Sequence, residues 1–311
     1  SRYRESTMRP TEYRYLHILA AIVVVLLAIA CGGQKAEEST KLEVYTAVPP
    51  VAWLAGQIGG EHVNVHVLID LGSDPHTFEP TPRQVTELGN AELFLLGRLP
   101  LEQRIMARIE GSDARVKIVD ITAGIAVEEH TDDETTEGIT HAASDPHVWL
   151  SPRNLKALTD NIADAFIAAD PKNSQAYHAG VFELRRKIDD LQIEITELLS
   201  PFEGSAVYVQ HPAFGTFLEE FGLRQKSMEG GSRNVSARHL NDLVEAARAE
   251  GVRAIFAQPQ FSDRGARTVA NAIGAEVRHL DPLVEDVLAN LRAMATAIRD
   301  ELASRAGREN R

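Results

Sequence analysis

The stretch LEVYTAVPPVAWLAGQIGGEHVNVHVLIDLGSDPH, residues 42–76, sets out the fold in one unit. Residues 42–48 are rich in β-branched and aromatic residues, which predicts a strand, and residues 51–60 predict a helix. Residues 62–69 alternate in character, which predicts a second strand. A strand, a helix and a strand in this order indicate a parallel sheet with the helix packed against it. The stretch ends at His76, in the loop after the second strand.

Further strands and helices continue this alternation on both sides of a long helical region. Strands are predicted at residues 93–97, 116–119, 206–210, 252–257 and 275–280, and helices at residues 82–89, 153–169, 173–199, 214–221, 240–250, 264–273 and 286–303. The helix at 173–199 would be about 40 Å long, because each helical residue adds about 1.5 Å. We therefore expect an α/β fold of two lobes, each with a parallel-rich sheet flanked by helices, joined by one long rigid helix. Loops at the carboxyl ends of the strands would meet in a cleft between the lobes.

These elements divide the chain into five parts. We expect a signal peptide at residues 1–30, a flexible tether at 31–41, an N-terminal α/β lobe at 42–170, a linking helix at 171–200 and a C-terminal α/β lobe at 201–311. The tether is assigned because residues 34–41 are polar and lack periodicity.

The N-terminal residues have the pattern of an export signal. Four arginines within residues 1–17 precede an unbroken run of thirteen apolar residues, Ile18–Ala30. That run is shorter than the about 17 to 25 residues of a membrane-spanning helix and is typical of a secretory signal. Leu27–Cys31 resembles a bacterial lipoprotein box, so we expect an exported protein, periplasmic or at the cell surface, tethered by a lipid on Cys31. Cleavage after Ala30 without a lipid and an uncleaved anchor are the alternatives.

Composition limits the possible partners. The chain has 44% hydrophobic and 25% charged residues, as a globular protein does, and a formal net charge of -13. The acidic excess argues against nucleic acid as a partner, because nucleic-acid binding needs an excess of Lys and Arg. The single cysteine excludes a disulfide framework, so the eleven histidines are the abundant soft ligands. Residues 128–144 predict an acidic loop whose His130 and His141 could capture zinc transiently.

Four candidate metal ligands lie next to proline residues in loops. They are His76 in Asp74-Pro75-His76, His147 in Asp145-Pro146-His147, His211 in His211-Pro212 and Asp281 in Asp281-Pro282. Proline fixes its own φ and restricts the residue before it, so these loops should be stiff and the site largely preformed. Three neutral imidazoles and one carboxylate suit a tetrahedral divalent ion, zinc above all. The carboxylate of Asp281 could bind through both of its oxygens.

The segments around these residues resemble a known family. They are GSDPHTFEP at residues 72–80, DPHVWLSP at 145–152, HPAFG at 211–215 and LDPL at 280–283. Over about residues 42–303 the chain resembles the zinc- or manganese-binding solute-binding proteins of bacterial ABC importers, and most of all the zinc-uptake binding lipoproteins. The resemblance implies that a metal ion is held between two lobes by residues His76, His147, His211 and Asp281. It also implies a monomer without enzymatic activity that delivers the ion to an ABC permease in the membrane.

Two positions bear on the choice of metal. Manganese-type members of this family tend to have Glu where His211 stands, so the third imidazole favours Zn²⁺ over Mn²⁺. Thr216 stands where members usually have an aromatic residue, and the acidic loop has fewer histidines than in many zinc-specific members.

Three other functions fit parts of the same pattern. The first is a manganese-specific binding protein of the same family. The second is a secreted zinc hydrolase with Asp281 or Glu229 as its base, although the chain has no HExxH helix. The third is an adhesin or structural surface lipoprotein built on the same fold.

Overall fold

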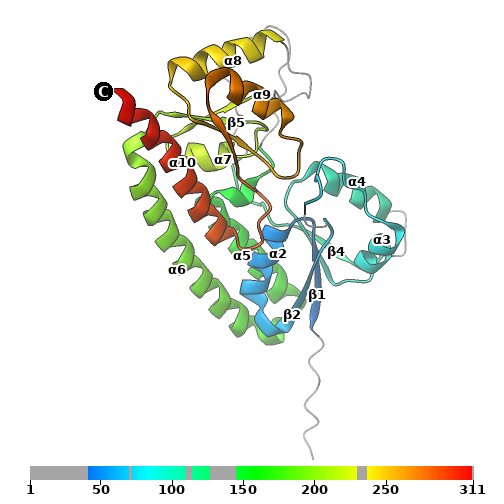
Figure 1. Cartoon of the computed structure of the whole chain (residues 1–311). Helices are drawn as coiled ribbons and strands as arrows, with labels where there is room; N and C mark the ends of the chain where they lie inside the picture. The colour runs from blue at the N-terminus through cyan, green and yellow to red at the C-terminus, as the bar shows by residue number, and fades with distance from the viewer. Residues whose placement is uncertain (1–40, 70–71, 110–113, 127–144, 230–236, 310–311) are drawn as a thin grey trace, which may run out of the picture. The chain divides into compact units, whose positions relative to one another are not determined.

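The computed structural model describes residues 41–69, 72–109, 114–126, 145–229 and 237–309 (Figure 1). The strands in these residues form two sheets of four strands each, and the strand pairs within both sheets are parallel. The predicted signal peptide, the predicted tether up to residue 40, Cys31, His130 and His141 lie outside the described residues. No helix among the described residues has the length and apolar character needed to cross a membrane.

The first sheet has the strand order β2-β1-β3-β4. Its strands are β1 (Leu42–Thr46), β2 (Val63–Val67), β3 (Leu93–Leu96) and β4 (Lys117–Asp120). The central strands β1 and β3 are mostly buried, whereas the edge strands β2 and β4 are mostly half-buried or exposed. Helices α2 (Pro49–Gly59), α3 (Pro82–Gly89) and α4 (Pro100–Ile109) connect or flank these strands.

The second sheet has the strand order β6-β5-β7-β8. Its strands are β5 (Ala206–Val209), β6 (Arg224–Ser227), β7 (Ala254–Ala257) and β8 (Glu276–His279). Its helices are α7 (Gly215–Glu220), α8 (Ala237–Ala249) and α9 (Arg264–Ile273). The central strands β5 and β7 are completely buried, as expected for a parallel sheet that is covered on both faces.

Three long helices complete the fold: α5 (Pro152–Ala169), α6 (Ser174–Leu199) and α10 (Val287–Glu309). Helix α6 has 26 residues and packs against α2, α5 and α10 (Figure 1). Its buried residues recur at spacings of three, four and seven positions, as one face of a helix requires: Tyr177, Leu184, Ile188, Leu191, Ile195 and Leu199. The two sheets flanked by helices and the long helix confirm the predicted fold class. The predicted domain boundaries stay a prediction.

One apolar core extends from the first sheet through α6 into the second sheet. Alternate residues of β5 divide between two cores, because successive side chains of a strand point to opposite faces. Val207 and Val209 belong to the large core, whereas Ala206 and Tyr208 belong to a smaller core with residues of α8 and α9. The two lobes therefore share their principal core.

Sequence patterns missed two elements, strand β6 and helix α4. Strand β6 reads RQKS and contains no apolar residue, so it has no hydrophobic signal. It forms because its backbone extends the sheet beside β5, with Ala206 opposite Arg224. Helix α4 buries Leu101, Ile105 and Ile109 at helical spacing, a pattern that was present in the sequence.

Gly180→Ala should lower the midpoint of thermal unfolding. A Cβ atom at Gly180 would stand 2.5 Å from the carbonyl oxygen of Ile58 and 2.9 Å from its Cα, so helices α6 and α2 would have to move apart. Overpacking of this kind costs about 1–3 kcal/mol. Gly56→Ala is the matched control in α2, because no atom lies within 4 Å of its added Cβ. Equal midpoints for the two variants would contradict this account of the helix contact.

Candidate metal centre

Three imidazole rings from distant parts of the sequence meet at one place. His76 lies in the loop after β2, His147 in the turn before α5, and His211 directly after β5. The ring centroids of His76 and His211 are 5.0 Å apart, and those of His147 and His211 are 6.4 Å apart. Rings that share one tetrahedral zinc would stand about 5 Å apart, because each Zn–N bond is about 2 Å long. The first spacing matches that value and the second is wider.

Asp281, the fourth predicted ligand, follows β8 and lies beside this cluster. The Nε2 of Gln260 donates to Asp281 Oδ1 at 2.7 Å, and Gln260 lines the same small cavity as His76 and His147. Among the described residues, no group of three or more His, Cys, Asp or Glu side chains stands at the spacing of a metal site. The structure thus brings three imidazoles together, but it does not set them and Asp281 in a finished coordination geometry.

The cavity beside the imidazoles has a volume of about 50 Å³ and a mainly apolar wall. Apart from His76 and His147, it is lined by Pro75, Leu99, Pro100, Leu101, Trp149, Gln258, Gln260, Phe261, Pro282 and Leu283. The ring of Phe261 lies 5.1 Å from that of His211 and 6.2 Å from that of His76. An apolar wall lowers the local dielectric constant and so strengthens the attraction between a cation and its ligands.

The three Asp-Pro loops that contain candidate ligands share one local geometry. In each, Oδ1 of the aspartate accepts a hydrogen bond from the backbone N–H two residues later: Asp74 from His76 at 2.8 Å, Asp145 from His147 at 2.9 Å, and Asp281 from Leu283 at 2.8 Å. This turn is a known preference of aspartate, and the intervening proline stiffens it. The repeated Asp-Pro pair therefore fixes the backbone of the loops that carry the candidate ligands.

Carboxylates orient two of the three imidazoles. His147 Nδ1 lies 2.7 Å from Asp145 Oδ1, and His211 Nδ1 lies 2.9 Å from Glu229 Oε2. A carboxylate on one ring nitrogen fixes the tautomer, so that the other nitrogen, Nε2, has the lone pair that a metal ion binds. Sequence reasoning considered Glu229 only as a hydrolase base and missed this contact, because 18 residues separate it from His211.

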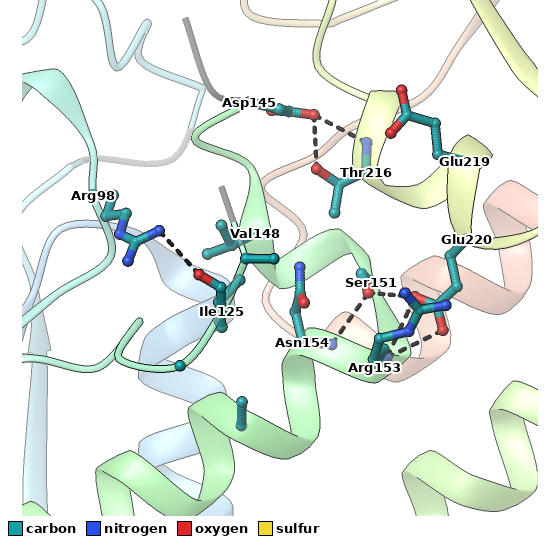
Figure 2. A pocket seen from close by; sticks show the side chains of 13 residues that line it. Arg98, Ile125, Asp145, Val148, Ser151, Arg153, Asn154, Thr216, Glu219 and Glu220 are labelled. Atoms are coloured by element: carbon teal, nitrogen blue, oxygen red, sulfur yellow. Dashed lines mark hydrogen bonds between the residues drawn. The ribbon is translucent and has the colours of Figure 1, made fainter. Parts of the chain in front are cut away.

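Asp145 also connects the two lobes (Figure 2). Its Oδ2 accepts hydrogen bonds from the backbone N–H and the hydroxyl of Thr216, at 3.1 and 3.0 Å, at the start of α7. Burial alone would raise the pKa of Asp145, but His147 and the Thr216 amide hold that pKa well below its usual range. Asp145 is therefore an ionised, buried carboxylate that acts on His147. Thr216 supplies a hydroxyl for it.

The other end of α7 is held to the same segment. Glu220 accepts hydrogen bonds from the Ser151 hydroxyl and from the backbone N–H of Arg153 (Figure 2). It also accepts one from the amide of Gln192. Burial raises the pKa of Glu220 despite these bonds. Between these two ties lies a larger cavity of about 260 Å³, lined by Asp145, Ser151 and Glu220 among others. Helix α7 thus joins the loop of His147 to the loop of His211.

The remaining candidate loops are braced from α4 and from the turn that contains Trp149. Arg104 of α4 donates to the carbonyls of His76 and Phe78, at 3.3 and 3.2 Å. Trp149 Nε1 donates to the carbonyl of Pro282 at 2.8 Å, which ties the His147 loop to the Asp281 loop. Glu79, three residues after His76, pairs with Arg108 at 2.9 Å.

Glu102 fixes the backbone of one wall of the small cavity. It is almost completely buried, and its two oxygens accept the backbone N–H groups of Gly97 and Leu99 at 2.9 and 3.0 Å. Arg98, between them, has a φ of 65° and is the only non-glycine residue with positive φ in the described part of the chain. Because a positive φ is unfavourable for arginine, the turn needs these bonds to hold it. Leu99 lies on the wall as a result.

Glu102→Gln should change the pH dependence of stability. Burial, opposed by the backbone amides, raises the pKa of Glu102 from 4.5 to about 7. Because the folded state binds this proton more tightly than the unfolded state, protonation of Glu102 adds to the free energy of unfolding. This contribution is complete below pH 4.5 and is lost as the pH rises to about 7. The fall in free energy of unfolding over that range, measured by urea denaturation, should be smaller in the variant than in the parent.

The control for this experiment is Glu197→Gln, on the exposed face of α6. It should leave the pH profile of the parent unchanged. Parallel profiles for the parent and Glu102→Gln would contradict the raised pKa.

Four of the five other described histidines have partners elsewhere. His66 Nε2 lies 2.6 Å from Glu43 Oε2, His239 Nε2 lies 3.0 Å from the carbonyl of Ser227, His279 Nε2 lies 3.7 Å from Asp263 Oδ2, and the ring of His62 lies edge-on to Tyr177. His178 is exposed on α6. None of these five lines the small cavity.

Two characterised proteins are similar to this chain over most of its length. It is 30% identical over 281 residues to the high-affinity zinc uptake system protein ZnuA of Bacillus subtilis, which covers 86% of this chain and 88% of that protein. It is 28% identical over 276 residues to the zinc-binding lipoprotein AdcA of Streptococcus pneumoniae. That match covers 86% of this chain but 55% of AdcA, so the chain spans about half the length of this relative.

Solved structures agree with these matches. The crystal structure of a ZnuA deletion mutant with zinc bound has a TM-score of 0.77 and 31% sequence identity, and the match covers 84% of this chain and 98% of that one. The family model described as zinc-uptake complex component A, periplasmic (ZnuA), matches residues 44–301. With most of its length matched by that model and by relatives of 30% identity, the chain belongs to the ZnuA family.

Proposed function

We propose that this protein is an extracytoplasmic solute-binding protein that captures Zn²⁺ and delivers it to an ABC-type permease for uptake. The observation that carries the proposal is the meeting of the His76, His147 and His211 rings, brought together from three separate loops. Two of these rings have a carboxylate on Nδ1, which is the arrangement that prepares Nε2 to bind a metal ion.

The proposed ligands of the ion are His76, His147, His211 and Asp281. This donor set fits zinc, which takes neutral imidazole and carboxylate ligands in tetrahedral sites. The hydrogen-bonded Asp-Pro turns support it, because a stiff loop loses little conformational freedom when the ion arrives. An ion would draw the three rings closer together. Most of that movement would bring His147 and His211 together, because their ring centroids are now 6.4 Å apart.

Capture, rather than catalysis, is the role that these residues favour. A catalytic zinc keeps one position open for water, whereas four protein ligands fill a tetrahedral shell. A hydrolase would also need a free base. Both candidates are engaged: Glu229 Oε2 lies on His211, and Asp281 Oδ1 accepts two hydrogen bonds. We therefore propose a protein without enzymatic activity. No contact among the described residues favours the adhesin alternative.

Movement on binding is proposed to be local. The two lobes share their principal core, so a wide opening would expose apolar side chains that are now buried. Closure of the ligand-bearing loops needs no such exposure. The proposed location is outside the cytoplasm, with a lipid on Cys31 and the protein acting as a monomer beside its permease.

The test is metal content after competition. The purified protein is stripped of metal, offered equimolar Zn²⁺ and Mn²⁺, desalted, and analysed for both elements. One zinc per protein would support the proposal. One manganese would favour the manganese-specific alternative within the same family. A protein that retains neither ion would contradict metal capture altogether.

A further inference from the structure

Within the described part of the chain, the side-chain amide of Gln260 makes one hydrogen bond, to Asp281, and leaves its buried oxygen without one, which does not favour stability. Its Nε2 donates to Asp281 Oδ1 at 2.7 Å, and a carboxylate can only accept, so the orientation of the amide is fixed. Its Oε1 is then buried and has no hydrogen-bond partner among the described residues. A buried acceptor without a partner is unfavourable, so an apolar residue would be the more stable choice here. The contact with Asp281 is what an apolar residue could not provide.

The same contact leaves the two oxygens of Asp281 unequal. Oδ1 accepts two hydrogen bonds, from Gln260 Nε2 at 2.7 Å and from the backbone N–H of Leu283 at 2.8 Å. Two donors occupy both lone pairs of a carboxylate oxygen. The loop itself is held by Asn290, whose Nδ2 donates to the Asp281 carbonyl at 2.7 Å. The carboxylate is therefore fixed in rotation, and Oδ2 is the oxygen left for a cation.

We propose that Gln260 is a specificity-determining residue, which makes Asp281 a ligand through one oxygen and thereby favours zinc over manganese. The inference rests on the proposed function of this site. With Oδ1 occupied, the shell contains three imidazole nitrogens and one oxygen, which is the four-coordinate set that zinc prefers. Manganese prefers more ligands and more oxygen among them. When Asp281 binds through one oxygen only, manganese lacks the second carboxylate oxygen as a further ligand.

This arrangement differs from binding through both Asp281 oxygens, which the sequence left open. The sequence could not distinguish the two modes, because Gln260 lies 21 positions before Asp281 and at the end of a different strand. The discriminating contact exists only once β7 and β8 lie side by side in the sheet.

Gln260→Met tests the inference. Methionine is similar in length and flexibility but cannot donate to Oδ1, so the carboxylate gains the freedom to bind through both oxygens. Zinc affinity should fall by about 10- to 100-fold, as it does when a partner of a metal ligand is removed. Manganese affinity should fall less or rise, so the zinc-to-manganese affinity ratio should drop by about tenfold or more. Both affinities are measured by competition with a chelator of known affinity.

The matched control is Gln210→Met. Gln210 is also buried and also has an unpartnered Oε1, but its Nε2 donates to the carbonyl of Ser262 at 3.0 Å and not to Asp281. Its affinity ratio should equal that of the parent. Gln260→Leu repeats the test if the methionine variant does not fold. Crystals of the zinc-loaded parent should show one Asp281 oxygen on the ion, and crystals of the loaded variant should show two.

Two results would overturn the inference and leave the proposed function standing. The first is a parent that binds one zinc while Gln260→Met and Gln210→Met have the same affinity ratio. The second is a zinc-loaded parent with both Asp281 oxygens on the ion. A parent that retains no divalent ion overturns both proposals together.

Discussion

Replacing His211 with alanine should lower the zinc affinity by more than about 100-fold. Removing a residue that only supports a metal ligand costs about 10- to 100-fold in affinity, and the loss of a ligand itself should exceed that. The ring of His211 lies next to both of the other rings: its centroid is 5.0 Å from that of His76 and 6.4 Å from that of His147. Its removal also leaves Glu229 without its imidazole partner. Titration against a chelator of known affinity measures the effect.

The control for this prediction is His66→Ala. His66 is a histidine on β2 whose partner is Glu43, and it lies outside the cluster. It should bind zinc as the parent does, and the metal-free forms of the parent and both variants should unfold at similar temperatures. Zinc binding by His211→Ala with the affinity of the parent would show that the ion is held elsewhere.

Asp145→Asn should reduce zinc affinity by about 10- to 100-fold. The substitution keeps the size of the side chain and can keep the turn to the His147 amide. It removes the negative charge that faces His147 Nδ1, and it presents an amide group where one of two accepting oxygens stood. If the remaining oxygen stays on His147, the amide group faces the backbone N–H of Thr216, which is also a donor. If the amide is turned over, it faces His147, and the imidazole loses the acceptor that fixes its tautomer. Isothermal titration with zinc measures the loss.

Glu220→Gln separates the two roles of Asp145. Glu220 holds the other end of α7 to the same segment, through Ser151 and Arg153, but contacts no imidazole. If Asp145 acts through His147, this variant should lose stability and keep its zinc affinity. Equal losses of zinc affinity in both variants would mean that Asp145 acts only by docking α7.

Much of the fold followed from strand and helix periodicity, since the central strands and the long helices are strongly apolar on the faces they bury. Strand β6 could not be predicted, because its polar residues take their structure from backbone pairing with β5. The convergence of the candidate ligands had a physical basis in the sequence. Parallel strands bring their carboxyl ends to one edge, so residues such as His211 that follow a strand gather there.

The supporting residues of the site were mostly outside the reach of sequence reasoning. Thr216 and Asp145 are 71 residues apart, and Gln260 and Asp281 lie in the loops that follow two different strands. The residues of each pair come together only when separate segments of the chain pack against each other in the folded protein. Asp145 was the exception, because its place two residues before His147 brings the two together through a local turn.

The core that runs through both lobes has a consequence for dividing the protein. A fragment that ends at Leu199 would expose the face of α6 that α10 covers, and a fragment that begins at Ser200 would expose Val207 and Val209. Each half expressed alone should therefore aggregate, whereas the two halves produced in the same cell should rescue each other by assembling. We therefore expect the chain to divide into a complementing pair and not into two autonomous modules.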